Sequence, residues 1–114
     1  MTEKKHLYLL WTNADVETAE KMVFMYGINS LRREWWEAVT LIVWGATAKL
    51  ASENETIRQL VREALDEGVQ VSACRACADL YGVTGNLEAL GIEVIYWGDP
   101  LTRILKADEK LLTV

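Results

Sequence analysis

The residues of this chain best suited to chemistry are Cys74 and Cys77, which occur as C-R-A-C where the apolar run at 69–73 gives way to a predicted helix. With Cys74 at the strand end and Cys77 one turn into the helix, both sulfurs should lie on the same side of the helix N-terminus. Unpaired backbone N–H groups and the helix dipole stabilise a thiolate there, Arg75 adds to this effect, and a solvated Asp79 opposes it only weakly. A nucleophilic thiolate is what sulfur transfer or disulfide exchange requires.

Three other interpretations of the cysteine pair remain open. A zinc site needs four ligands, and with two cysteines and the single histidine His6 only pairs from two subunits could complete one. Thioredoxin-like chemistry shares the order strand, C-x-x-C, helix, but here the motif follows the third strand, and Pro100 is poorly placed to serve as a facing cis-proline. Two inert cysteines that pack as small hydrophobic residues are the third alternative.

The ends of the predicted strands share a second feature. Strands one, two and four each end in a tryptophan, and strand three ends at Cys74. In open α/β sheets the ligand crevice lies beyond the carboxyl ends of the strands, so three indoles and one thiol are expected at one rim. The alternative is that each indole fills the layer between sheet and helices. The residues expected to bind a ligand at this rim are Trp11, Thr12, Asn13, Trp44, Gly45, Ala46, Arg75, Trp97 and Gly98.

The elements that must position these residues alternate between strand and helix patterns with short connections, as in a parallel α/β sheet. Apolar runs such as TLIVW indicate strands covered on both faces. One helix is predicted over 53–67, started by a capping box of Ser52 and Glu55 and ended by Gly68. The strands are predicted at 6–11, 38–44, 69–73, 92–97 and 110–114, in a three-layer α/β/α domain that spans residues 1–114.

A further helix is predicted from residues 12–15 to about Arg33, and its segment MVFMYGI is apolar around nearly the whole turn. Because one buried face does not absorb so many apolar side chains, the outer face is expected to contact another subunit. The alternative is a single crowded core helix. The hypothesis of a homo-oligomer depends on Met22, Phe24, Met25 and Ile28.

Composition excludes several functions. Seventeen acidic and 12 basic residues give a formal charge of −5 without a basic cluster, so nucleic acid is not expected as a partner. No segment approaches the roughly 20 apolar residues of a membrane span, and the apolar run near the N-terminus is too short for a signal peptide. We expect a cytoplasmic protein with reduced thiols. No G-x-G-x-x-G or P-loop motif is present, so no cofactor is expected, and His6 lies too far from the crevice for a Ser-His-Asp arrangement.

The sequence also resembles a known family. The runs GVQVSAC and LEALGIEVIYWG, the helix ending LYGV, the terminal ADEKLLTV and the upstream VTLIVWG are similar to the DsrE/DsrF-like family of small α/β proteins over essentially the whole chain. The resemblance implies this fold, trimeric or hexameric assembly, and a persulfide on Cys74 that is passed between donor and acceptor proteins. Cys77 departs from that pattern.

The sequence therefore predicts a sulfur carrier that accepts sulfane sulfur on Cys74, with Cys77 as an auxiliary thiol. The alternative is a module of an oligomeric assembly that binds a small ligand or senses redox state through the dithiol, without turnover. A purely structural subunit is the third possibility, and whether the protein is an enzyme stays open.

Overall fold

A computed structural model describes residues 3–114. The chain contains one five-stranded sheet with the strand order β4-β3-β2-β1-β5. All neighbouring strands are parallel. The predicted α/β fold with a parallel five-stranded sheet is confirmed. The strands are β1 (His6–Trp11), β2 (Ala38–Val43), β3 (Gln70–Cys74), β4 (Glu93–Ile95) and β5 (Lys110–Thr113).

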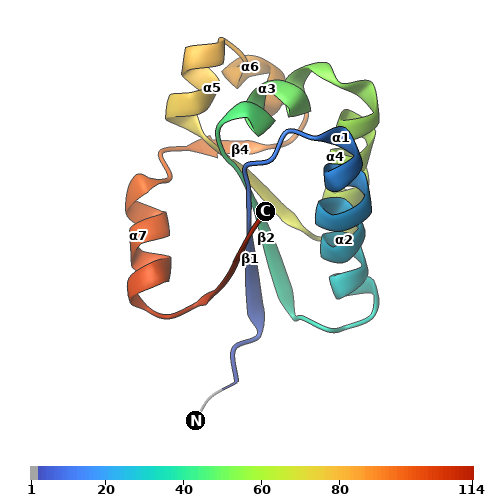
Figure 1. Ribbon diagram of the computed structural model, residues 1–114, viewed down its shortest axis with the longest axis vertical. Helices are drawn as coiled ribbons and strands as arrows, with labels where there is room; N and C mark the ends of the chain where they lie inside the picture. Colours follow the sequence, from blue (N-terminus) through green and yellow to red (C-terminus); the bar gives the residue numbers. More distant parts are fainter. Residues whose placement is uncertain (1–2) are drawn as a thin grey trace.

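The strand order explains how the helices divide between the two faces of the sheet (Figure 1). From β1 to β4 each strand is added on the same side of the previous one, so right-handed crossovers place the intervening helices on one face. The return from β4 to β5 runs in the opposite direction and places α7 on the other face. The helical segments are α1 (Val16–Thr18), the π-helical η1 (Ala19–Phe24), α2 (Met25–Arg32), α3 (Ala46–Glu53), α4 (Glu55–Glu67), α5 (Arg75–Tyr81), α6 (Thr84–Ala89) and α7 (Gly98–Lys106).

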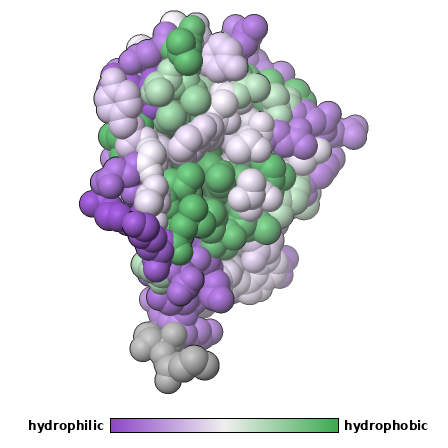
Figure 2. Space-filling model, turned by 60° about the vertical axis from the view of Figure 1, so that its left-hand side comes forward, coloured by the Kyte–Doolittle hydropathy of each residue, from purple (hydrophilic) through white to green (hydrophobic). Residues whose placement is uncertain are grey.

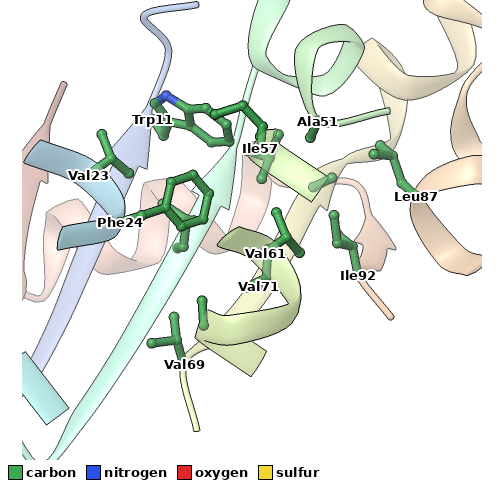
Figure 3. Packing of buried hydrophobic residues seen from close by; sticks show 14 of the residues in the cluster. Trp11, Val23, Phe24, Ala51, Ile57, Val61, Val69, Val71, Leu87 and Ile92 are labelled. Carbon is green, nitrogen blue, oxygen red and sulfur yellow. The ribbon is translucent and has the colours of Figure 1, made fainter. Parts of the chain in front are cut away.

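The main core lies between the sheet and the helices of the first face (Figure 3). In β1 the buried residues alternate with half-buried ones, so that Leu7, Leu9 and Trp11 face this core. From the helices, Phe24 and Val61 pack into the same cluster. β2 is buried on both faces along almost its whole length, as its continuous apolar pattern predicts.

The helix predicted at 53–67 is α4, and Gly68 ends it in the left-handed conformation as predicted, with φ of 102°. The predicted capping box is wrong. Asn54 is the N-cap and accepts a hydrogen bond from the Ile57 N–H, whereas the Ser52 hydroxyl donates to Lys49 within α3. A second helix, α3, ends immediately before α4 and occupies the position of the predicted cap.

The apolar first helix runs from Val16 to Arg32 with a π-helical stretch in its middle. Phe24 and Ile28 are buried in the main core and Met22 packs against it, so only Met25, at 51% exposure, presents a large apolar surface to solvent. The expectation that four apolar residues of this helix form an outer contact surface is therefore wrong. The structure favours the crowded core helix, because both the sheet and α4 contact this segment.

The α7 face of the sheet is less completely covered. Figure 2, which brings the α7 side forward, shows an apolar area near the middle of this face bordered by hydrophilic residues. Leu105 of α7 is exposed by 55%. Within residues 3–114, no helix is both long and apolar enough to cross a membrane.

Candidate functional site

The two cysteines lie at the point where the connections of the sheet change face. The chain leaves β3 into α5, whose Ala78 packs into the main core, and leaves β4 toward α7 on the opposite face. Cys74 ends β3 and is paired with Ile95 at the end of β4. Open α/β sheets bind ligands outside the carboxyl ends of strands whose connections diverge in this way. The topology therefore places Cys74 where a ligand site is expected.

The Cys74 side chain lies on the α7 face and is only 4% exposed. It belongs to a small buried cluster with Ile42, Trp97 and Ile104, which is separate from the main core. Trp97 and Ile104 both come from the segment that leaves β4 and forms α7. The thiol is consequently covered by α7 and by the indole that precedes it.

A chain of two hydrogen bonds holds this indole in place. Trp97 Nε1–H donates to Ser72 Oγ at 2.7 Å, and Ser72 Oγ–H donates to Glu93 Oε1 at 2.8 Å. Ser72 precedes Cys74 by two residues on the same face of β3, so its hydroxyl lies directly below the thiol in the sheet. The predicted strand at 92–97 ends early, at Ile95, and Trp97 already has helical backbone angles.

Cys77 is half-buried one turn into α5 and packs against both clusters. Its Sγ accepts a hydrogen bond from the Gly45 N–H at 3.4 Å. Gly45 has φ of 72° and ψ of −136°, a conformation that glycine adopts without a Cβ penalty. This conformation directs the Gly45 amide toward the sulfur.

The surroundings of Cys77 raise the pKa of its thiol. Burial is the largest cause and the neighbouring Cys74 thiol adds to it, while the Gly45 N–H acts in the opposite direction. The position of Cys77 near the helix N-terminus therefore does not bring the pKa of its thiol below the ordinary value. The same interaction shows that the two thiols are neighbours, as the C-x-x-C spacing predicts.

The charged groups near the motif point elsewhere. The Arg75 guanidinium donates to the Val94 carbonyl at 2.9 Å and lies 3.8 Å from the Glu88 carboxylate. The Asp79 carboxylate accepts a hydrogen bond from the Thr84 hydroxyl. Both side chains thus fix α5 to its neighbours, β4 and α6.

The three rim tryptophans do not wall one crevice. Trp11 is fully buried in the main core, where its ring meets Phe24 edge to face at 5.3 Å and its Nε1–H donates to the Asn13 carbonyl (Figure 3). The strand register gives the reason, because Trp11 pairs with Val43, and Val43 pairs with Ala73. The next residue along β3, Cys74, points to the opposite face of the sheet.

Trp44 and Trp97, by contrast, both contact the Cys74 cluster, Trp97 buried within it and Trp44 half-buried against it. Gly45 joins them through its hydrogen bond to Cys77. Ala46 and Gly98 are the exposed first residues of α3 and α7.

Thr12 and Asn13 lie at the end of β1 and help to anchor the chain end. Both backbone N–H groups donate to the Val114 carbonyl, and the Thr12 hydroxyl donates to the same oxygen. The Asn13 Oδ1 accepts the Asp15 N–H. Since β2 separates β1 from β3, these two residues are about 10 Å away from the end of β3 in the sheet.

Sequence reasoning missed Ser72, Glu93 and Ile104, which surround the Trp97 ring and the thiol. The alternation of a strand already gave a signal for Ser72, because a residue two positions before Cys74 must share its face. Glu93 and Ile104 carried no such signal, since the pairing of β4 with β3 and the packing of α7 are tertiary features. His6 lies near the other end of β1, and within residues 3–114 no three His, Cys, Asp or Glu side chains gather into a metal-binding group.

A parallel sheet of this order, with a thiol pair at the divergence of its connections, defines a small α/β fold. The structure is similar to that of BT1422, a conserved protein of unknown function from Bacteroides thetaiotaomicron, with a TM-score of 0.95 and 37% identity over 96% of this chain and 95% of that chain. The chain belongs to the same family as BT1422. No family model and no curated protein matches it.

A more distant similarity supports the resemblance at the level of the fold. The YchN protein from E. coli superimposes with a TM-score of 0.71 and 16% identity, over 98% of this chain and all of that chain. YchN has a DsrE-like fold. The fold of this chain is accordingly DsrE-like.

Proposed function

We propose that this protein carries sulfane sulfur on Cys74, with Cys77 as an auxiliary thiol. The observation that carries the proposal is the position of Cys74, at the carboxyl end of β3 where the connections diverge, with a second thiol beside it. The DsrE-like fold supports it, because the residue that matches Cys74 in the sulfur-relay members of the resembling family bears a persulfide. We also propose that one partner protein donates the sulfur to Cys74 and another accepts it.

The loading step is a thiol–persulfide exchange. The Cys74 thiolate attacks the outer sulfur of a donor persulfide R–S–SH, the donor S–S bond breaks, and R–S⁻ leaves and takes up a proton. Cys74 then carries –S–SH. In the transfer step an acceptor thiolate attacks that outer sulfur and Cys74 leaves as a thiolate, so no external oxidant or reductant is consumed.

Cys77 offers the persulfide a second outcome. A Cys77 thiolate that attacks the inner sulfur of Cys74-S-SH forms the Cys74–Cys77 disulfide and expels HS⁻. Because the pKa of the Cys77 thiol is raised, the thiolate fraction near neutral pH is reduced and this release is slow. The persulfide therefore lasts longer on Cys74 than it would beside an activated thiol.

Loading requires a local movement, since the thiol is 4% exposed beneath Trp97 and α7. The indole is held by Ser72. A shift of Trp97 or of α7 would uncover Cys74 on the α7 face of the sheet. The same cover shields a loaded persulfide from solvent.

The test is the intact mass of the reduced protein after treatment with a low-molecular-weight persulfide, alongside Cys74→Ser and Cys77→Ser. We expect a gain of one sulfur atom in the wild type, none in Cys74→Ser, and a longer-lived adduct in Cys77→Ser. Equal gain in the wild type and Cys74→Ser would refute the proposal.

A second candidate is a dithiol redox sensor, favoured by the adjacency of the two thiols. Mild oxidation would join Cys74 and Cys77 in a disulfide. A disulfide that forms readily in a protein that accepts no persulfide would select this function over sulfur transport.

Self-association and location complete the proposal. The resemblance suggests a homotrimer or homohexamer, and the apolar area on the α7 side, where Leu105 is exposed, is the surface on which we would expect subunits to meet. Light scattering at micromolar concentration tests this, and a monomer would contradict it. A cytoplasmic location is proposed because both thiols must stay reduced to react.

A further inference from the structure

A groove of about 680 Å³ lies on the α7 face of the sheet, below the Cys74 cluster. Side chains of β1, β2, β3 and β4 contribute to its walls, and α7 closes one side. Along β3 the residues that face this side are Gln70, Ser72 and then Cys74, at steps of about 6.6 Å. The groove therefore continues toward the end of the sheet that holds the thiol.

The hydrogen bonds among His6, Thr40 and Gln70 in the groove leave one donor group free. Thr40 Oγ1–H donates to Gln70 Oε1 at 2.9 Å, so the 2.7 Å contact between His6 Nε2 and Thr40 Oγ1 must be donated by the imidazole. The Gln70 carbonyl is thus occupied. Within residues 3–114 no acceptor bonds the amide nitrogen of Gln70, an exposed residue that lines the groove.

Glu93 leaves one acceptor atom free. The Ser72 hydroxyl donates to Glu93 Oε1, and no donor of the described residues bonds Glu93 Oε2. Since Glu93 pairs with Ser72 and Gln70 lies two residues earlier on β3, the backbone positions of Gln70 and Glu93 are about 8 Å apart on one face. The side chains of Gln70 and Glu93 therefore line the groove from the same face of the sheet.

Arg103 of α7 adds a positive charge to the same groove. Its partner Asp99 lies 3.3 Å away, and both side chains are more than 70% exposed. An exposed pair of this kind contributes little, so the guanidinium can exchange Asp99 for a ligand carboxylate. The groove thus combines one anion, one cation and one free amide donor.

We propose that this groove binds a zwitterionic α-amino acid with an apolar side chain. The ammonium group bonds Glu93 Oε2, and the carboxylate bonds the Gln70 amide and Arg103. The two charged groups of such a ligand share one carbon atom, and with a hydrogen bond of about 2.9 Å at each end they span roughly 8 Å, the separation of the backbone positions of Gln70 and Glu93. The ligand side chain extends along the apolar wall formed by Ile95 and Ile104, toward Cys74.

The binding test uses L-methionine and two analogues that each lack one charge. These are 3-(methylthio)propylamine, without the carboxylate, and 4-(methylthio)butanoate, without the ammonium. In NMR titrations of ¹⁵N-labelled protein, L-methionine should shift the Gln70 side-chain amide signals, and both analogues should bind at least about tenfold more weakly. An amine that binds as well as L-methionine, or no shift up to 20 mM ligand, would overturn the proposal.

A pair of matched variants separates binding at this site from an effect on folding. Glu93→Gln keeps the acceptor for Ser72 and removes the charge, so it should weaken L-methionine binding about tenfold without loss of fold. Glu53→Gln removes an exposed carboxylate of α3, outside the groove, and is the matched control. The Cys74 thiol forms no bond to the ligand in this proposal, which is therefore independent of sulfur transport. Equal affinity of Glu93→Gln and Glu53→Gln would reject it.

Discussion

The cover over Cys74 leads to a quantitative prediction about Ser72→Ala. This change leaves the buried Trp97 Nε1–H without the acceptor that now lies at 2.7 Å. An unsatisfied buried donor costs about 1–3 kcal/mol. When Trp97 moves away and its indole N–H meets water, this cost disappears. The variant therefore destabilises the covered state of Cys74 selectively.

The expected effect on reactivity follows from that difference. If alkylation of Cys74 proceeds through local opening, its rate follows the population of the open state. A cost of about 1–3 kcal/mol raises that population about 5- to 150-fold. Iodoacetamide labelling followed by intact mass measures the rate, in a Cys77→Ser background so that only one thiol reacts.

Ser52→Ala is the control for this experiment. Ser52 is also a buried serine with one hydrogen bond, to the Lys49 carbonyl in α3, but it does not contact the Cys74 cluster. It should leave the Cys74 labelling rate unchanged. A Ser72→Ala rate within twofold of this control would refute the idea that the bonded indole governs access to the thiol.

Three further outcomes are expected. The rate of Cys77 alkylation should still be rising above pH 9.0, because folding raises the pKa of this thiol. For the same reason the stability that the thiol contributes is complete below pH 9.0 and is lost as the pH rises through the folded value. Urea unfolding from pH 8 to 10.5 measures this loss. Gly45→Ala places a Cβ on a residue with φ of 72° and should cost about 1–3 kcal/mol in urea unfolding, whereas Gly85→Ala, in a helix without positive φ, should be neutral or stabilising. Asn54→Ala should cost about 1 kcal/mol as the loss of an N-cap; a larger loss in Ser52→Ala would restore the predicted capping box.

The fold was largely readable from the chain because its signals are local. Continuous apolar runs located β1, β2 and β3 to within one residue, and the left-handed Gly68 located the end of α4. Two helices in series were harder to separate. Both Ser52 and Asn54 are capping residue types, and only the hydrogen bonds formed in the fold decide that α3 ends before Asn54 caps α4.

The candidate site was predictable in part. The strand-to-helix change located the cysteine pair at the rim of the sheet, and the crossover pattern confirms that the connections diverge there. The orientation of the tryptophans was not predictable, because it depends on which residues of neighbouring strands are paired. Trp11 is level with Ala73, one residue before Cys74, so the side chains of Trp11 and Cys74 point to opposite faces of the sheet.

The sequence by itself determined the class of the fold, the strands, and the adjacency of two thiols three residues apart, since periodicity and short spacing are properties of the local backbone. Tertiary structure alone decided that Cys74 is covered, that the pKa of Cys77 is raised, and that Gln70 and Glu93 face one groove. Burial, electrostatics and hydrogen bonding depend on what distant segments bring against a side chain. Those segments meet only when β4 joins the edge of the sheet and α7 returns across its open face.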